Sequence, residues 1–326
     1  MGKQGIMIKI GIYGGAGYTA GELIRLLVNH PQAQIEWVVS NSQAGRPISE
    51  VHSGLVGETD LKFIGELPNL THIDLLFLCQ GHGQSTQFWS EHERPASLRV
   101  IDLAQDFRDE SEGYVYGLPE WQRNRITKAQ LVANPGCFAT AIQLALLPAA
   151  LRRLLTNDIS VNAITGSTGA GVKPSATTHF SWRVDNLSIY KPFQHQHLAE
   201  IRRTLSSMQP SLPDIDFIPY RGNFARGIFC TAVIKNRELD ETIIDVYKQF
   251  YASSPFTHVS DQPIDLKQVV GTNKCLLHID VFEGKILVTS VIDNLLKGAV
   301  GQAVENMNLM FHLPEDTGLH LKASAF

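Results

Sequence analysis

The sequence has few cysteines and no long apolar run. Its four cysteines, Cys79, Cys137, Cys230 and Cys275, are too few and too far apart for a disulfide framework or a zinc cluster, so we expect no bound metal. No apolar run reaches the roughly 18 residues that a membrane-spanning helix needs. The 28 lysines and arginines against 32 aspartates and glutamates give a net charge of −4. Without a basic excess, we expect neither a nucleic-acid nor a membrane partner.

The N-terminal residues also lack the apolar core and the cleavage site of a secretion signal, which predicts a cytoplasmic protein. Hydrophobic residues make up 44% of the chain and charged residues 18%, a composition that excludes an intrinsically disordered protein. A length of 326 residues favours two domains of ordinary size.

In the first 135 residues, short apolar runs alternate with segments of helical spacing. The runs are typical of strands and lie at 8–13, 35–39, 73–79, 100–103 and 131–133. Continuous apolar strands separated by helices indicate a parallel sheet covered on both faces. This pattern predicts an α/β fold with a Rossmann-type domain.

The pattern changes after the long apolar helix predicted at 138–155. Strand-like segments follow at 159–165, 229–234, 276–282 and 286–292, with helices at 239–251 and 295–311. The alternation of apolar and polar residues in LHIDVF is typical of a half-buried antiparallel strand. We therefore expect an α+β catalytic and dimerisation domain with a mostly antiparallel sheet. The predicted boundaries are 1–136 with 295–326 for the cofactor-binding domain and 137–294 for the catalytic domain.

A glycine-rich loop joins the first predicted strand to the first predicted helix. Gly14, Gly15 and Gly17 allow a tight turn and let backbone N–H groups approach a phosphate at the helix N-terminus. The spacing G-x-x-G-x-x-A differs from the usual G-x-G-x-x-G, and a turn that binds nothing remains an alternative. The strand–loop–helix context favours a dinucleotide site.

The end of the second predicted strand indicates which dinucleotide is bound. An NAD site usually has an acidic residue there, for the ribose hydroxyls. This chain has Ser40 and Ser42, followed by Arg46, and hydroxyls with a guanidinium suit a 2′-phosphate. The expected cofactor is NADP; the alternative is a polar loop without a ligand.

Cys137 follows Asn-Pro-Gly and directly precedes the long apolar helix. A thiol at a helix N-terminus is stabilised as the thiolate by free N–H groups and the helix dipole. The other three cysteines lie in apolar strand segments and are expected to be inert core thiols. The alternative for Cys137 is a small residue that packs at a helix cap.

A thiolate nucleophile needs an acid–base partner. His195 and His197 lie five and three residues before Glu200 in the segment QHQHLAEI. A polar helix start or a pair of surface histidines would give the same pattern. A metal site is also an alternative, although no third ligand is evident. An extended segment would bring both rings to one side more easily than a helix would.

The order of these motifs resembles the N-acetyl-γ-glutamyl-phosphate reductase family of arginine biosynthesis. The resemblance covers nearly the whole chain through GGAGYTAGELIRLL, SNSQAGRPIS, DLAQDFR, YGLPE, NPGCFAT, GSTGAGVKPS, HQHLAEI, GNFARGI and DNLLKGAVGQAVENMN. Aspartate-semialdehyde dehydrogenases share the fold and the thiol but lack the paired HxHxxEI and YGLPE segments. The chain has CFAT where the family usually has CYPT, and AQDFR where SxDFR is common.

The resemblance implies an NADPH-dependent reduction of an acyl phosphate through a cysteine thioester. It implies Cys137 as nucleophile, His195 as acid–base group and Arg108, His197 and Arg226 as substrate-binding residues. The residues implied for the NADP site are Gly14, Gly15, Gly17, Ser40, Ser42, Arg46 and Asn294, the last at the nicotinamide end. A homodimer or homotetramer is also implied. The alternatives are a related semialdehyde dehydrogenase with another acyl phosphate and a non-enzymatic NADP-binding regulator.

Overall fold

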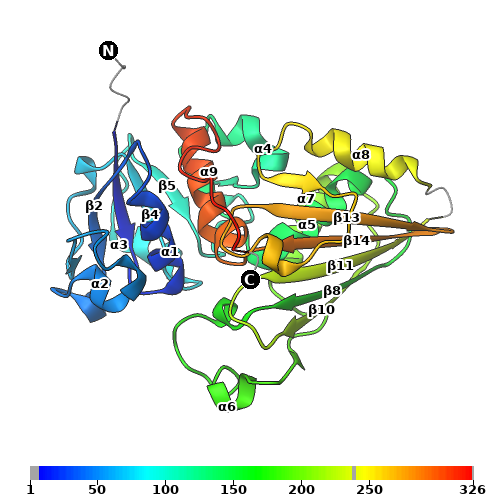
Figure 1. Ribbon diagram of the computed structural model, residues 1–326. Helices are drawn as coiled ribbons and strands as arrows, with labels where there is room; N and C mark the ends of the chain where they lie inside the picture. Colours follow the sequence, from blue (N-terminus) through cyan, green and yellow to red (C-terminus); the bar gives the residue numbers. More distant parts are fainter. Residues whose placement is uncertain (1–6, 237–239, 325–326) are drawn as a thin grey trace. The chain divides into compact units, whose positions relative to one another are not determined.

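The computed structural model describes residues 7–236 and 240–324 of the chain. The chain divides into two compact units, coloured by sequence in Figure 1. Unit 1 comprises Met1–Pro135 and Ala299–His320, and unit 2 comprises Gly136–Gly298 and Leu321–Phe326. None of the helices in the described ranges is long and apolar enough to cross a membrane.

Unit 1 is built on a seven-stranded sheet with the order β3-β2-β1-β4-β5-β7-β6, in which every neighbouring pair is parallel. The central strands are apolar on both faces, and all four residues of β4 are buried. This confirms the predicted Rossmann-type α/β unit. The strands are β1 (Ile8–Tyr13), β2 (Ala33–Val39), β3 (Phe63–Ile64), β4 (Leu75–Leu78), β5 (Arg99–Asp102), β6 (Val115–Tyr116) and β7 (Leu131–Ala133).

The first helix of unit 1, α1 (Tyr18–Leu27), buries an apolar side. In α1 the buried residues include Leu23, Ile24 and Leu27, at the spacing that the sequence pattern predicts. The helices are α1 (Tyr18–Leu27), α2 (Ile48–Val51), α3 (Gln84–Glu91), α4 (Pro119–Ile126) and α9 (Gly301–Met310). Short 3₁₀ turns lie at Asn41–Gln43, Ser53–Leu55, Leu70–His72 and Ser111–Gly113.

Unit 2 contains a second seven-stranded sheet with the order β12-β13-β14-β11-β8-β10-β9. Figure 1 shows β13, β14, β11, β8 and β10 side by side in this order. Its strands are β8 (Ile159–Thr165), β9 (Ser188–Ile189), β10 (Ile215–Arg221), β11 (Ile228–Lys235), β12 (Thr257–Val259), β13 (Cys275–Phe282) and β14 (Lys285–Ile292). The remaining helices are α5 (Cys137–Leu151), α6 (Phe180–Arg183), α7 (His197–Met208) and α8 (Thr242–Tyr251). Further 3₁₀ turns lie at Ser167–Ala170 and Leu266–Gln268, and a π-helical segment lies at Leu296–Val300.

The sheet of unit 2 is mixed: of its pairs of neighbouring strands, four are antiparallel, as predicted, and two are parallel. Strand β10 runs parallel to β8, and β12 runs parallel to β13. A parallel neighbour needs a long crossover connection, and the chain between β8 and β10 includes α7. The sequence pattern predicts no strand at β10 and therefore no such crossover.

The central helix of unit 2 is α5, which is apolar on all sides and buried over most of its length. Pro148 lies inside this helix and has no N–H group for the carbonyl of Leu144. The hydroxyl of Tyr251 in α8 donates to that carbonyl at 2.6 Å, and the hydroxyl of Tyr247 donates to the carbonyl of Ala145 at 2.6 Å. These two bonds join α8 to the irregular part of α5.

Two predicted helices differ in detail from the observed ones. The helix predicted at 295–311 begins as the π-helical segment and continues as α9. The helix predicted at 239–251 is α8, which begins at Thr242, while residue 239 lies outside the described residues.

Candidate active site

Cys137 is the first residue of α5 and is partly exposed. Gly136 precedes it in an extended conformation, with φ −71° and ψ 153°. No acidic residue lies in the first turn of α5, and no side chain caps the helix. The N-terminal N–H groups and the helix dipole can therefore stabilise negative charge on the sulfur.

The other thiols lie in different surroundings. Burial raises the pKa of Cys79 and of Cys230 above the ordinary range of a thiol. Cys275 is buried, and its sulfur lies 3.6 Å from the Ser290 hydroxyl. The structure therefore agrees with the expectation of core thiols for Cys230 and Cys275, whereas Cys79 follows the end of β4 and is partly exposed.

His195 and His197 lie together at the N-terminus of α7. His195 lies just before the helix, Gln196 already has the helical angles φ −57° and ψ −25°, and His197 is the first residue of α7. Their ring centroids are 4.5 Å apart, although the residue between them is helical and not extended as the sequence pattern favoured. The ring of Phe138, which follows Cys137 in α5, is 5.3 Å from the His195 ring and 6.2 Å from the His197 ring. The histidine pair therefore lies beside the first turn of the helix that Cys137 begins.

His195 is only 5% exposed and is surrounded by the rings of Phe138, Tyr190 and Phe217. Burial, with a smaller effect from the charge of Lys191, lowers the pKa of His195 to about 4. The ring is therefore neutral near pH 7. The His197 N–H group donates to Nδ1 of His195 at 3.3 Å, which assigns the ring proton to Nε2.

Glu200 is a member of the site to which the sequence analysis gave no role. Its carboxylate accepts a hydrogen bond from the Gly136 N–H group at 3.1 Å and lies 3.9 Å from Nε2 of His197. A Cβ atom at Gly136 would overlap the His197 ring, so glycine is required there. The i, i+3 spacing of His197 and Glu200 on a helix was the signal that could have found this residue.

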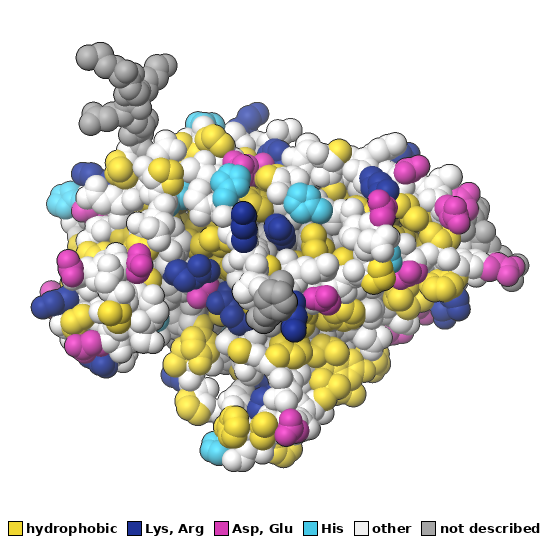
Figure 2. All heavy atoms as spheres, in the orientation of Figure 1, with side chains coloured by type: hydrophobic (Ala, Val, Ile, Leu, Met, Phe, Trp, Pro, Cys, Tyr) yellow, Lys and Arg dark blue, Asp and Glu magenta, His cyan; other side chains and the backbone are white. Residues whose placement is uncertain are grey.

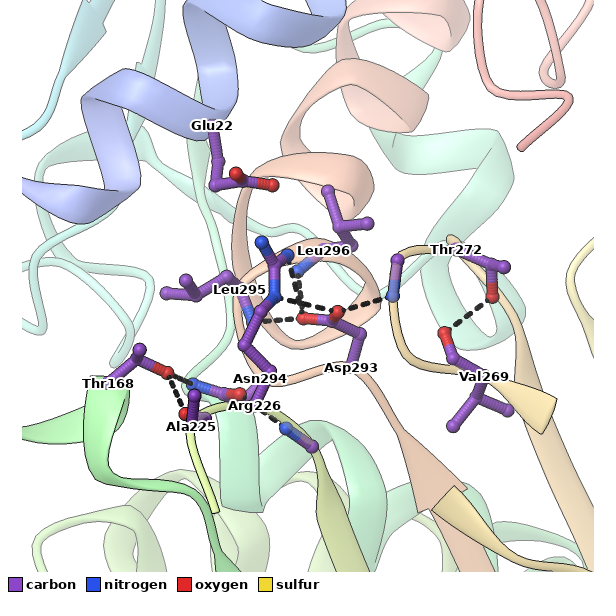
Figure 3. Close-up of polar contacts among 12 residues, drawn as sticks. Glu22, Thr168, Ala225, Arg226, Val269, Thr272, Asp293, Asn294, Leu295 and Leu296 are labelled. Carbon is purple, nitrogen blue, oxygen red and sulfur yellow. Dashed lines mark hydrogen bonds and ion pairs between the residues drawn. The ribbon is translucent and has the colours of Figure 1, made fainter. Parts of the chain in front are cut away.

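Asp293 begins the segment 293–298, which follows β14 and lies beside Cys137. This fully buried carboxylate pairs with Arg226, at 3.0 Å to Nε and 3.1 Å to Nη2 (Figure 3). It also accepts from the N–H groups of Gly271, Leu295 and Leu296. A Cβ atom at Gly298 would lie only 2.9 Å from the Cβ of Cys137, so this loop needs glycine beside the thiol.

Asn294 and Arg226 lie together in this loop region of unit 2. Asn294 accepts from the Gly227 N–H group at 2.8 Å and donates to the Thr168 hydroxyl at 3.0 Å (Figure 3). The Thr168 hydroxyl in turn donates to the Ala225 carbonyl at 2.6 Å. No described contact tests the expected role of Asn294 at the nicotinamide, which stays a prediction.

Arg108 lies in unit 1 and is 7% exposed. Its Nε donates to the carbonyl of Asn134 at 2.8 Å, and its Nη2 donates to the carbonyl of Leu103 at 3.1 Å. These bonds hold the loop after β5 against the end of β7. Its expected role in substrate binding stays a prediction.

The predicted dinucleotide loop lies between β1 and α1 of unit 1. Gly14 has φ +91°, which favours glycine, and a Cβ atom at Gly15 would overlap the Val38 side chain. Gly17 precedes α1, which has no side-chain cap and no acidic residue in its first turn. A helix N-terminus of this kind fits the pyrophosphate of a dinucleotide.

Ser40, Ser42 and Arg46 follow β2 on the same edge of the sheet. The two hydroxyls are 3.5 Å apart, and Arg46 bonds to Gln43 at 2.6 Å and to Glu50 at 3.1 Å. The Arg46 side chain is half exposed. An exposed ion pair is weak, so a bound phosphate can compete for this guanidinium. Across the described ranges, no three His, Cys, Asp or Glu side chains gather in a way that could hold a metal ion.

The two units and the thiol site define a class of enzyme, the semialdehyde dehydrogenases. Residues 9–129 match the family model "Semialdehyde dehydrogenase, NAD binding domain", and residues 137–294 match "Semialdehyde dehydrogenase, dimerisation domain". Aspartate semialdehyde dehydrogenase II from Vibrio cholerae has the same fold, with a TM-score of 0.71 at 14% identity, over 94% of this chain and 98% of that chain. The enzyme from Candida albicans, solved with NADP, has a TM-score of 0.69 at 15% identity, over 93% and 98%.

Curated relatives define the group within this class. N-acetyl-gamma-glutamyl-phosphate reductases from Bacteroides thetaiotaomicron and Parabacteroides distasonis are each 58% identical over 98% of this chain and 100% of their own length. The enzyme from Flavobacterium johnsoniae is 50% identical over the same shares. The chain belongs to the N-acetyl-gamma-glutamyl-phosphate reductase family.

Proposed function

We propose that the protein reduces N-acetyl-γ-glutamyl phosphate to N-acetylglutamate γ-semialdehyde with NADPH and releases phosphate, as a step of arginine biosynthesis. The observation that carries the proposal is the partly exposed Cys137 at the N-terminus of α5, with the His195–His197 pair beside it. Relatives of that name at 58% identity support the choice of substrate.

The cofactor is assigned to the edge of the unit 1 sheet. Gly14, Gly15 and Gly17 would hold the pyrophosphate, and Ser40, Ser42 and Arg46 would hold the 2′-phosphate. Asn294 would contact the nicotinamide. When bound, NADPH supplies the hydride for the reduction.

The chain's own residues carry the remaining chemistry. The Cys137 thiolate attacks the acyl carbon, the bond from that carbon to the phosphate oxygen breaks, and a thioester and inorganic phosphate form. The thioester carbon then accepts the hydride. Collapse of the resulting oxyanion breaks the C–S bond, releases the aldehyde and returns the thiolate.

His195 is positioned to stabilise the oxyanion. Its Nε2 carries the ring proton and can donate to the developing negative charge. An anionic substrate nearby raises the pKa of His195 toward the working range, so the same atom can transfer a proton. Glu200 keeps the Gly136 N–H group and the His197 ring in place, and His197, Arg108 and Arg226 are assigned to the substrate.

We further propose that residues 1–136 and 295–326 bind the cofactor and that residues 137–294 carry catalysis and oligomerisation. A homodimer or homotetramer is supported by the dimerisation-domain match. We place the protein in the cytoplasm. None of its four cysteines, all within the described residues, forms a disulfide, and a thiolate nucleophile needs a reducing compartment.

The test is NADPH oxidation by the purified protein, followed at 340 nm with two acyl phosphates. N-acetyl-γ-glutamyl phosphate should support turnover, whereas β-aspartyl phosphate should not. Activity with β-aspartyl phosphate alone would assign the chain to the reaction named for its structural neighbours. Binding of NADPH without any turnover would support a regulator instead.

A further inference from the structure

Arg221 ends strand β10 and has an unusual environment for an arginine in unit 2. Its guanidinium lies over the Tyr190 ring, 4.6 Å from the centroid. Nη1 of Arg183 donates to the Arg221 carbonyl at 2.6 Å and fixes the backbone there. Among the described residues, no carboxylate pairs with Arg221, and its buried Nε has no hydrogen-bond partner.

Two nearby arginines are already engaged. Arg226 forms a two-point pair with the buried carboxylate of Asp293. Arg183 donates to the carbonyls of Thr177 and Asn186 and to the Ser188 hydroxyl. In this part of unit 2, Arg221 is therefore the guanidinium that a ligand can use without breaking a protein ion pair.

Tyr190 connects Arg221 to the thiol site. Its ring is 5.8 Å from the His195 ring and 6.4 Å from the ring of Phe138, next to Cys137. Burial raises the pKa of Tyr190, the negative charge of Cys137 adds to the increase, and Arg221 opposes it. Arg221 thus belongs to the same cluster as Cys137 but is separated from it by one aromatic ring.

We infer that Arg221, held over the Tyr190 ring, binds the carboxylate of the N-acetylglutamyl group and so orients this substrate. The inference rests on the proposed function. The phosphate is bonded to the acyl carbon and must lie next to the sulfur of Cys137 when the thiolate attacks. The carboxylate is several bonds from the acyl carbon. This separation fits Arg221, because the Tyr190 ring lies between its guanidinium and the thiol site. A planar guanidinium can bind a carboxylate through two parallel hydrogen bonds.

The reverse reaction separates the two anions, because the aldehyde carries the carboxylate and inorganic phosphate is a second substrate. In R221Q we expect the KM for the aldehyde to rise at least tenfold, while the KM for phosphate changes less than twofold. R202Q is the matched control, since Arg202 forms an exposed pair with Asp214, and it should change neither KM. A rise in the phosphate KM alone, or no rise in either, would overturn the inference.

A substrate lacking the charge gives a readout that a purely structural role would not change. With the aldehyde whose carboxylate is converted to an amide, wild type and R221Q should have the same kcat/KM. An equal loss with both aldehydes would mean that Arg221 only supports the fold. If R221Q does not fold, kcat/KM for the two aldehydes is compared between wild type and R221K. Failure of wild type to oxidise the aldehyde with phosphate and NADP would instead reject the proposed function.

Discussion

Cys137 differs from the other thiols of the chain through its local backbone. It begins a helix after Gly136, whereas Cys230 and Cys275 lie within buried strands. His195 differs from an ordinary histidine through its aromatic surroundings, which exclude water and favour the neutral ring. At this scale the reactivity of the site depends on burial and on helix position.

The low pKa of His195 predicts a specific pH dependence of stability. The unfolded chain binds a proton at this ring near pH 6.5, but the folded protein does so only near pH 4. The contribution of His195 is therefore fully present above pH 6.5 and is lost as the pH falls from 6.5 toward 4. Between pH 7 and pH 5 the loss is on the order of 2 kcal/mol. Urea unfolding of wild type and H195N at both pH values measures it.

H195N should lose less stability over this range than wild type does. His30 and His258 also have lowered pKa values because of burial, so a residual slope is expected in both proteins. The same slope in wild type and variant would contradict a neutral, buried His195.

The position of Arg46 after β2 predicts a preference for NADPH over NADH. R46A should raise the KM for NADPH about tenfold, the effect of losing one charge-assisted contact to phosphate, and leave the KM for NADH nearly unchanged. R25A, which removes an arginine from α1 of the same unit, should change neither value. If R46A raised the KM for NADPH and the KM for NADH by the same factor, Arg46 would not contact the 2′-phosphate.

Helix α5 shows what a sequence pattern can and cannot predict for an element. The apolar run after Cys137 predicted the helix, and Pro148 predicted an irregularity within it. The pattern could not show that Tyr251, more than 100 residues later, supplies the missing hydrogen bond. Such a contact depends on the tertiary packing of α8.

The hydrogen bond of Tyr251 to α5 predicts that removing its hydroxyl lowers the free energy of unfolding. Tyr251 is 3% exposed, and Y251F would leave the Leu144 carbonyl without this donor, at a cost of about 1–3 kcal/mol in unfolding free energy. Y18F, at an exposed tyrosine, should cost less than about 0.5 kcal/mol. In a P148A background the cost of Y251F should shrink, because the amide at position 148 then supplies a donor. An undiminished cost there would contradict this explanation.

The mixed sheet of unit 2 contains strands that the sequence pattern could not predict. The segments that became β8, β11, β13 and β14 were predicted within about two residues, whereas β9, β10 and β12 were missed. The short β9 and β12 give little pattern, and Pro219 interrupts the apolar run of β10. Strand direction depends on the connections between strands, so missing β10 also meant missing its parallel pairing with β8.

For the molecule as a whole, residues from distant parts of the chain meet at the site. Cys137 and the histidine pair were recognisable from local sequence, because a helix start and an H-x-H segment are local features. Glu200, Gly298 and Arg221 were not, because their roles depend on contacts with Gly136, Cys137 and Tyr190. The sequence therefore predicts the proposed reacting groups better than the residues proposed to position them.

The surface of unit 2 predicts self-association. Seven of the twelve large hydrophobic side chains exposed among the described residues lie within residues 172–193, and Phe180 is 78% exposed. Figure 2 shows hydrophobic side chains gathered over α6 and the neighbouring edge of the sheet. A patch of this kind marks a protein interface. The double variant F180S/W182S should have a lower mass by light scattering than wild type.

F282S, at another exposed phenylalanine of unit 2, should keep the wild-type mass. A monomeric wild type, or an unchanged mass in the double variant, would contradict an interface at this segment.

The covalent intermediate on Cys137 tests the account most directly. The protein is incubated with N-acetyl-γ-glutamyl phosphate in the absence of NADPH, quenched in acid and digested for mass spectrometry. We predict an N-acetylglutamyl adduct on the peptide that contains Cys137, which NADPH discharges and which C137S does not form. An adduct on Cys79, Cys230 or Cys275 instead, or full turnover by C137S, would contradict the account.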